Sequence, residues 1–423
     1  MKIGILAYHS ACNYGANLQV LSTVGYLQRK GHVPRVLNFE PLDLMEYYNK
    51  KVPHDTYDMY RKFREKTMPL SKHCTSVEEL AQIIDDERIE GIIIGSDAVA
   101  QHHTLLERIT FPSSRFITVY KMTSDRLFPN PFWGTFSDFL KYSVPMAIMS
   151  SSSQDSEFRL FTPNLRKKME KYLSRFVYIS ARDEWTKKMY KCISNGRLNV
   201  DITPDPVFSF NQNMLAMVPS KDSILRKFHL PEKYYLLSFL NNRTVSAEWI
   251  LSFERMASLN GIACAALPFP QGICFTNNLA YTIATPLDPI DWYALIKYSV
   301  GYIGHNMHPI VVALHNAIPF FSFDNYGVSK YKGLYTNDCS SKIYHILQNA
   351  GFLNNRVSCL KYGYQPPAAS DVITALLEFN HDKALNFARE YQLKYESMMN
   401  EILYSLNNVN VAYCFCENEP QLK

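Results

Sequence analysis

The chain has 423 residues, of which 47% are hydrophobic and 20% are charged. That length predicts two or three domains, and the composition predicts a sizeable core and excludes disorder, collagen-like repeats and a coiled coil. Lys and Arg exceed Asp and Glu by five, which is too few for a nucleic-acid signature but compatible with a local basic pocket for an anionic ligand.

The first segments of the chain predict a strand, a loop, a helix and a second strand. Residues 2–8 predict a buried parallel strand, and a polar turn follows it. Apolar residues then recur at helical spacing between residues 18 and 27, and residues 33–39 supply the next strand. This order is typical of a doubly wound α/β domain.

The same alternation continues to about residue 210. Residues 41–76 are polar and helix-like, and residues 100–145 are irregular and aromatic. Helices are predicted at 77–86 and from Pro163, and strands at 91–95, 144–149 and 176–180. The strand at 91–95 (GIIIG) is apolar throughout, as expected of a strand buried on both faces.

A second α/β pattern begins after residues 211–232, which lose periodicity and predict a linker. Strands are predicted at 234–240, 262–267, 300–304 and 318–323, and helices at 246–259, from Asp288 or Asp291, and at 309–316. We therefore expect two Rossmann-like domains that face each other across a cleft, with boundaries 1–212 and 213–380. Residues 381–423 would form a C-terminal helix and tail.

The segment around His308 is the most informative about chemistry. A short strand ends near Gly304, a polar loop follows, and a helix begins with Pro309 in its first turn. His308 is therefore expected beside free backbone N–H groups at the positive end of a helix dipole, which is an anion site. An imidazole there can donate to a phosphate or carboxylate and can carry a proton. The alternative is a polar loop histidine without a ligand.

The cysteines and the apolar runs bear on the compartment. Nine cysteines are scattered without a CxxC pair, which predicts free thiols rather than a zinc site or a disulfide framework. The N-terminal apolar run of about six residues is too short for a signal peptide, and no run reaches the roughly 18 apolar residues of a membrane span. We expect a soluble cytoplasmic protein that contacts a membrane at most peripherally, at its inner face.

Four separated stretches carry a resemblance to a known family. They are, in chain order, IGILAYHSACNYGANLQVL, IIIGSDAV, VYISARDEWTKKMY with the later ITPDPVF, and DPIDWYALIKYSVGYIGHNMHPIVVALHNAIPFFSF. Their order and spacing resemble the polysaccharide pyruvyl transferases, which move the pyruvyl group of phosphoenolpyruvate onto sugar hydroxyls. The resemblance implies a GT-B-like fold, with phosphoenolpyruvate as a co-substrate and neither a metal nor another cofactor.

The resemblance also implies a role for His308, which matches the family's loop histidine, as the general acid and base near phosphoenolpyruvate. Two positions depart from the family. Members usually have a small residue where Pro309 stands, and many have Arg where Asn306 stands. Because Asn cannot replace the charge of Arg, the donor needs another cation.

Candidate donor-binding residues are Arg182, His305, Asn306, Lys330 and Lys332. Arg182 has a second interpretation, in which it pairs with Asp183 at the start of a helix. Candidate acceptor-binding residues are Asn13, Tyr14, Gly15, Gln19 and Asp97 at the ends of two strands. Gly15 would let the backbone approach a sugar closely; the alternative for these residues is ordinary turn and cap chemistry, with Gln19 on an exposed helix face.

The predicted reaction is formation of a pyruvate ketal on two hydroxyls of a sugar, with release of phosphate. The acceptor would belong to a surface polysaccharide or its lipid-linked precursor, bound by the N-terminal domain. Two alternatives remain open: a sugar-nucleotide-dependent glycosyltransferase of the same fold, for which no clear ribose-binding Glu is found, and a non-catalytic glycan-binding relative.

Overall fold

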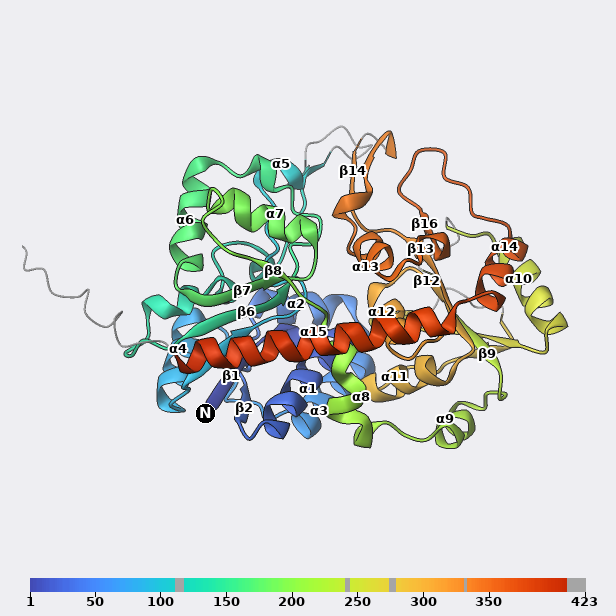
Figure 1. The fold of residues 1–423 in the computed structure, drawn as a ribbon, viewed down its shortest axis with the longest axis horizontal. Coiled ribbons are helices and arrows are strands. Elements are labelled where there is room, and N and C mark those ends of the chain that lie inside the picture. Colours follow the sequence, from blue (N-terminus) through green and yellow to red (C-terminus); the bar gives the residue numbers. More distant parts are fainter. Residues whose placement is uncertain (111–117, 240–243, 274–278, 331–332, 409–423) are drawn as a thin grey trace, which may run out of the picture.

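A computed structural model describes residues 1–110, 118–239, 244–273, 279–330 and 333–408. Figure 1 shows two α/β halves side by side, joined along one side by a long helix. Each half is built on a six-stranded sheet in which all strand pairs are parallel.

The first sheet has the strand order β2-β1-β3-β6-β7-β8. The central strand β3 is buried at every residue, as its all-apolar sequence predicts. The strands of this sheet are β1 (Lys2–Leu6), β2 (Val33–Val36), β3 (Gly91–Ile94), β6 (Met146–Ser151), β7 (Phe176–Ala181) and β8 (Asp201–Ile202).

Helices begin where polar side chains can cap them. The Asn13 side chain accepts a hydrogen bond from the Ala16 N–H at the start of α1, and Ser76 and Glu79 form a reciprocal capping box on α4. The helices of this half are α1 (Tyr14–Arg29), α2 (Leu42–Lys51), α3 (His54–Thr67), α4 (Val77–Asp86), α5 (Leu105–Arg108), α6 (Pro163–Leu173) and α7 (Glu184–Ile193). Two further strands, β4 (Ile109–Thr110) and β5 (Thr118–Val119), pair antiparallel.

The second sheet has the order β11-β10-β9-β12-β13-β16. Its strands are β9 (Tyr234–Ser238), β10 (Ala263–Ala266), β11 (Tyr281–Thr282), β12 (Gly301–Gly304), β13 (Phe320–Asp324) and β16 (Arg356–Ser358). Its helices are α10 (Ala247–Leu259), α11 (Pro289–Tyr298), α12 (Met307–His315), α13 (Lys342–Ala350) and α14 (Ala369–Leu377), and β14 (Val328–Lys330) pairs antiparallel with β15 (Tyr335–Asn337).

The expectation of an aperiodic linker at 211–232 is wrong in its detail. The segment contains α8 (Phe210–Met214) and α9 (Lys221–Phe228), and the Ser220 hydroxyl caps α9. α8 spans five residues and α9 spans eight, so each shows apolar spacing over no more than about two turns. Only Ile224 of α9 is buried. Along the chain, β8 is the last strand of the first sheet and β9 is the first strand of the second sheet. The exact domain boundaries stay a prediction.

The helix α15 (His381–Asn407) ties the two halves together. It packs against α12 and α13 of the second half and against β6 and β7 of the first, and Figure 1 shows it crossing both halves. The Tyr26 hydroxyl of α1 donates to Asn400 at 2.8 Å. One continuous hydrophobic cluster consequently runs through both halves, and a second lies within the second half. No described helix has the length and apolar character needed to cross a membrane.

Candidate functional site

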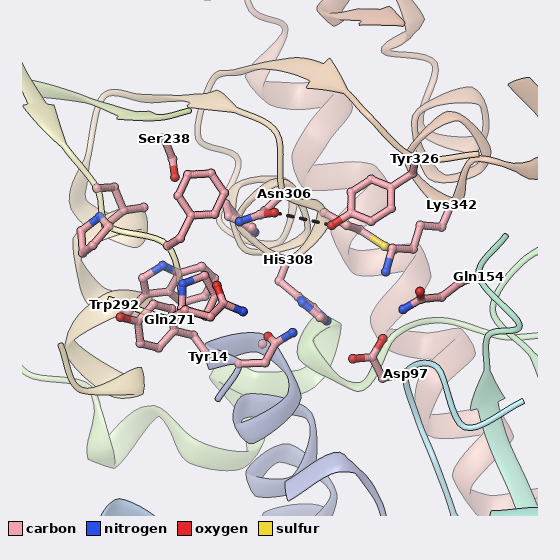
Figure 2. A pocket seen from close by; sticks show the side chains of 18 residues that line it. Tyr14, Asp97, Gln154, Ser238, Gln271, Trp292, Asn306, His308, Tyr326 and Lys342 are labelled. Carbon is pink, nitrogen blue, oxygen red and sulfur yellow. Dashed lines mark hydrogen bonds between the residues drawn. The ribbon is translucent and has the colours of Figure 1, made fainter. Parts of the chain in front are cut away.

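A cavity of about 160 Å³ lies where the two halves meet. It is surrounded by the segments that follow the carboxyl ends of parallel strands in both sheets, the usual ligand position in open α/β folds. Figure 2 shows side chains from both halves converging on it. Its lining consists of Asn13, Tyr14, Gly15, Asp97, Gln154, Ser238, Leu267, Pro268, Phe269, Pro270, Gln271, Trp292, Asn306, Met307, His308, Pro309, Tyr326 and Lys342.

The first half contributes three strand-end loops. Asn13, Tyr14 and Gly15 follow β1, Asp97 follows β3, and Gln154 follows β6. The Tyr14 ring stacks on Trp292 of the second half, with centroids 5.2 Å apart and planes 27° apart. Four of the five predicted acceptor residues therefore line the cavity, as part of a wall that both halves build.

The second half contributes the start of α12. Asn306 occupies the N-cap position, so the backbone N–H groups of the first helical turn have no helical acceptor. The Asn306 side chain accepts a long hydrogen bond from the Tyr326 hydroxyl at 3.5 Å. His308 lies in this first turn, where the sequence places it, and points toward the first half (Figure 2).

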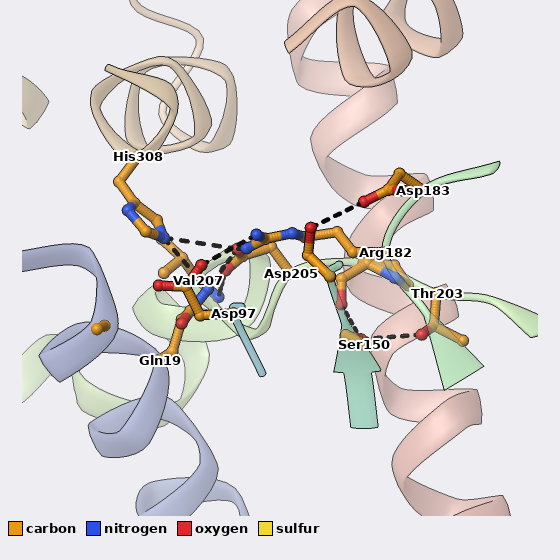
Figure 3. Close-up of polar contacts among 12 residues, drawn as sticks. Gln19, Asp97, Ser150, Arg182, Asp183, Thr203, Asp205, Val207 and His308 are labelled. Atoms are coloured by element: carbon orange, nitrogen blue, oxygen red, sulfur yellow. Dashed lines mark hydrogen bonds and ion pairs between the residues drawn. The ribbon is translucent and has the colours of Figure 1, made fainter. Parts of the chain in front are cut away.

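The imidazole of His308 rests against polar groups of the first half (Figure 3). Its Nε2 lies 3.3 Å from Gln19 Nε2 and 3.9 Å from Asp205 Oδ2, and the Gln19 amide donates to the same carboxylate oxygen at 2.6 Å. An amide N–H that faces Nε2 requires an unprotonated Nε2, so this hydrogen-bond network assigns the ring hydrogen to Nδ1.

Burial lowers the pKa of His308 below its usual value of 6.5. The carboxylates of Asp97 and Asp205 oppose this effect, and the charges of Arg182 and Lys342 add to it. The ring is therefore neutral at pH 7. A further negative charge in the cavity would raise its pKa.

Arg182 lies outside the cavity lining, although the sequence makes it a candidate donor ligand. Its guanidinium donates to Asp205 at 2.8 Å and to Asp97 at 3.1 Å, and its side chain is 4% exposed. Asp183 caps α7, as the second interpretation of this pair predicts, by accepting from the Thr186 N–H at 2.8 Å, but it does not pair with Arg182. The structure thus replaces the expected Arg182–Asp183 pair with a buried bridge between two other carboxylates.

The carboxylate of Asp97 faces the cavity and is charged. Burial alone would raise its pKa, but Lys342, Arg182 and His308 together hold the pKa well below the usual range. Besides Tyr14 and Tyr326, whose pKa values are raised by burial, the described ionisable residues of the lining are one acid, one lysine and one neutral histidine. The cavity is not strongly basic, contrary to the basic pocket that the net charge allowed.

The predicted replacement cations do not supply a charge in the described part of the cavity. His305 is buried behind the lining, its Nδ1 lies 3.1 Å from the Phe323 carbonyl oxygen, and burial lowers its pKa to about 4. It carries no charge at neutral pH. Lys330 belongs to β14, but its side chain and the whole of Lys332 lie outside the described residues.

Gln19 is 2% exposed and does not lie on an open helix face. It contacts the Asp205–His308 pair and does not line the cavity. Gly15 lines the cavity and also abuts the His308 ring, where an added Cβ would lie 2.0 Å from Cγ. Gln19 and Gly15, two of the five predicted acceptor-binding residues, therefore both contact His308.

Sequence reasoning missed two residues that matter here. Asp205 belongs to a recognised motif, ITPDPVF, but had no assigned role. Lys342 begins α13 in a region where no element was predicted, and no motif marks it. Among the described residues, no group of three or more potential metal ligands occurs.

Solved structures share this fold at low sequence identity. The UDP-N-acetylglucosamine 2-epimerase of Rickettsia bellii is 10% identical with a TM-score of 0.54, covering 98% of this chain and 99% of that chain. The UDP-GlcNAc 2-epimerase of Neisseria meningitidis, bound to UDP-GlcNAc, is 11% identical with a TM-score of 0.54, covering 96% and 100%. The MnaA–UDP structure of S. aureus is 12% identical with a TM-score of 0.50, covering 96% and 97%. These likenesses show the fold, which is GT-B-like, with two Rossmann-like domains.

A comparison with curated proteins finds no match. A family model described as polysaccharide pyruvyl transferase matches residues 13–326. The match runs from the cap of α1 to Tyr326 and so takes in both sides of the cavity. The chain belongs to the polysaccharide pyruvyl transferase family.

Proposed function

We propose that the protein transfers the pyruvyl group of phosphoenolpyruvate to two hydroxyls of one sugar, forming a cyclic ketal and releasing phosphate. The observation that carries the proposal is the position of His308, a buried imidazole in the first turn of α12 that lines a cavity shared by both halves. The free N–H groups of this turn favour an anion, and the imidazole is suited to proton transfer. No other cofactor is expected.

In the proposed reaction His308 donates a proton in one step and receives one in the next, so its protonated form is restored. As the imidazolium, it donates a proton to the methylene carbon of the donor, and the sugar hydroxyl that attacks the adjacent carbon returns a proton to the ring. The carbon–oxygen bond to phosphate then breaks, the second hydroxyl closes the ketal, and its proton leaves with the phosphate. One hydroxyl proton thus ends in the new methyl group and the other on phosphate.

Charge explains how a neutral ring becomes an acid. Its pKa is lowered in the free protein by burial. Bound phosphoenolpyruvate brings a phosphate and a carboxylate beside it, and nearby negative charge raises the pKa of a histidine. The donor therefore promotes protonation of the imidazole that then protonates its methylene carbon.

The acceptor side of the proposal rests on the polar and aromatic wall of the cavity. Asn13, Gln154 and Gln271 provide amide groups for sugar hydroxyls, and Asp97 provides an acceptor for one of them. Tyr14 provides an aromatic face, although its stacking on Trp292 occupies part of it. The sugar would belong to a growing surface polysaccharide.

A lipid-linked acceptor requires contact with a membrane, and the surface formed by α6 and α7 supports it. Residues 163–197 hold ten Lys and Arg against three Asp and Glu, whereas the whole chain has a surplus of five. Lys167, Lys168, Lys171 and Lys188 are exposed there. Each basic residue near an anionic bilayer contributes about 1 kcal/mol. Binding to vesicles with and without phosphatidylglycerol, with Lys167→Glu/Lys168→Glu/Lys171→Glu as the variant, tests this attachment.

The decisive experiment measures phosphate release from phosphoenolpyruvate with candidate glycans. The wild-type chain should release phosphate only when a glycan is present. His308→Ala should reduce the rate of release by about 10²- to 10⁴-fold, while His54→Ala, a change at an exposed histidine of α3, should leave it unchanged.

Other outcomes would favour the other two functions. Full-rate release by His308→Ala would overturn the mechanism. Tight binding of uridine or cytidine diphosphate without turnover of phosphoenolpyruvate would indicate a glycosyltransferase. Glycan binding with neither property would indicate a non-catalytic relative.

A further inference from the structure

Lys342 is a buried cation whose charge no described side chain neutralises at short range. The residue is 7% exposed, and its side chain lines the cavity at the first position of α13. Among the described residues, no carboxylate oxygen lies within 4.0 Å of its ammonium group. No described atom accepts a hydrogen bond from that group. Arg182, by contrast, is bridged by two carboxylates. A buried ammonium without a partner is costly, so its presence calls for an anion.

The neighbours of Lys342 hold it in one corner of the cavity. Its Nζ lies over the Tyr326 ring, 4.6 Å from the centroid, a cation–π contact that orients the charge without neutralising it. The Tyr326 hydroxyl reaches the Asn306 side chain at the N-cap of α12. The ammonium and the start of a nine-residue helix therefore belong to the same corner (Figure 2).

We propose that Lys342, Tyr326, Asn306 and the first turn of α12 form a phosphate-binding subsite, in which Lys342 supplies the cation that position 306 lacks. The ammonium and the helix N–H groups provide hydrogen-bond donors from two elements, and the helix dipole adds a favourable field. The identity of the ligand as the donor's phosphate rests on the proposed function, whereas binding of a phosphate group does not.

The electrostatics around Lys342 are compatible with binding of an anion. Burial lowers the pKa of Lys342, and Asp97 opposes that effect from across the cavity. A phosphate in the corner would raise the pKa further toward the value of a solvated lysine. Asp97 would also limit how far the phosphate can move toward the first half, because like charges repel.

Calorimetric titration with three probes tests the subsite: inorganic phosphate, phosphoenolpyruvate and pyruvate. Lys342→Met keeps the length of the side chain and removes the charge. It should weaken binding of phosphate and phosphoenolpyruvate by about 10- to 100-fold, the range for loss of a charged hydrogen bond, and leave pyruvate binding unchanged. The matched control is Lys62→Met, at an exposed lysine of α3, which should bind all three as the wild type does.

Thermal unfolding separates binding from folding. Replacing an unpaired buried charge with an apolar chain should leave the Tm unchanged or raise it, so a large fall in Tm would show that Lys342 has a structural role and would overturn the proposal. Asn306→Arg placed on Lys342→Met should restore phosphate binding, because it returns a cation to the same corner. Wild-type phosphate affinity in Lys342→Met would also overturn the proposal.

Failure of the proposed function gives a different pattern. If phosphoenolpyruvate is not the donor, no glycan will support phosphate release, yet inorganic phosphate will still bind in a Lys342-dependent manner. If the subsite is wrong, phosphate release will persist in Lys342→Met with an unchanged KM for phosphoenolpyruvate.

Discussion

The backbone of Gly15 lies directly against the imidazole of His308. A Cβ at position 15 would lie 2.0 Å from Cγ, 2.3 Å from Nδ1 and 2.4 Å from Cδ2 of that ring. The two residues belong to different halves and are separated by almost the whole α/β pattern. Gly15, which the sequence predicts to contact a sugar, therefore also leaves space for the imidazole of His308.

Gly15→Ala should displace the imidazole and reduce kcat/KM by about 100-fold, because a displacement of about 1 Å in a reacting group can cost that much. The fold should survive, since Gly15 lies in the first turn of α1 and Ala favours a helix. Steady-state assays of phosphate release, with circular dichroism for the fold, would measure both effects.

A double-mutant cycle tests whether the loss acts through His308. In the His308→Ala background the space for the new methyl group is already present, so Gly15→Ala should have no further effect on the residual rate. Equal fractional losses in both backgrounds would show that Gly15 affects the reaction in some other way, such as direct contact with the acceptor.

Asp205 should set the pH at which His308 titrates. Its carboxylate, 3.9 Å from Nε2, is one of two that raise the pKa of a ring whose burial lowers it below 6.5. Because the proposed first step needs the imidazolium, kcat/KM should fall as the pH rises through this lowered pKa. Asp205→Asn removes a favourable charge and should move that limb to lower pH by about 1 to 2 units.

The matched control for this shift is Asp201→Asn, in β8, a carboxylate outside the cavity lining. Its pH profile should superimpose on that of the wild type. A profile of Asp205→Asn that keeps its limb and loses only amplitude would mean that Asp205 does not tune His308.

Repeating patterns explain why most of the fold could be predicted. Helices such as α4 and strands such as β3 have lengths and periodicities that depend on local sequence, and both appear at the expected residues. The missed elements include the nine-residue helices α13 and α14. Others are strands paired over only two or three residues, such as β11 and the β14–β15 pair. Their pairing depends on neighbours far along the chain, which a local pattern does not contain.

The residues of the site also differ in whether the local sequence could predict them. His308 was predictable because a strand, a loop and a helix start lie consecutively around it. Lys342 was not, because its importance comes from folding that brings the start of α13 beside Tyr326 and across from Asp97. The pairing of Arg182 with Asp205 was equally hidden, since it joins the ends of different segments in a buried network.

The final prediction concerns stability, and it is independent of the function. Four described histidines outside the cavity lining are buried and neutral: burial lowers the pKa of His9, His102 and His305 to about 4 and that of His315 to about 3. His315 accepts a hydrogen bond at Nε2 from the Asn211 N–H at 3.2 Å, which requires the unprotonated nitrogen. Because the unfolded chain binds these protons near pH 6.5 and the folded chain does not, the free energy of unfolding should decrease as the pH falls from 6.5 toward the folded pKa values.

The slope assigned to one histidine is on the order of 1.4 kcal/mol per pH unit within that window. His315→Phe should flatten the profile by about that amount, since it removes the titrating ring. It should also cost about 1 kcal/mol at pH 7 through the lost hydrogen bond to Asn211. His54→Asn, at an exposed position, should leave the slope as it is. Denaturant unfolding at pH 5 and pH 7 would measure the difference, and an unchanged slope in His315→Phe would show that His315 is not among the groups that drive acid unfolding.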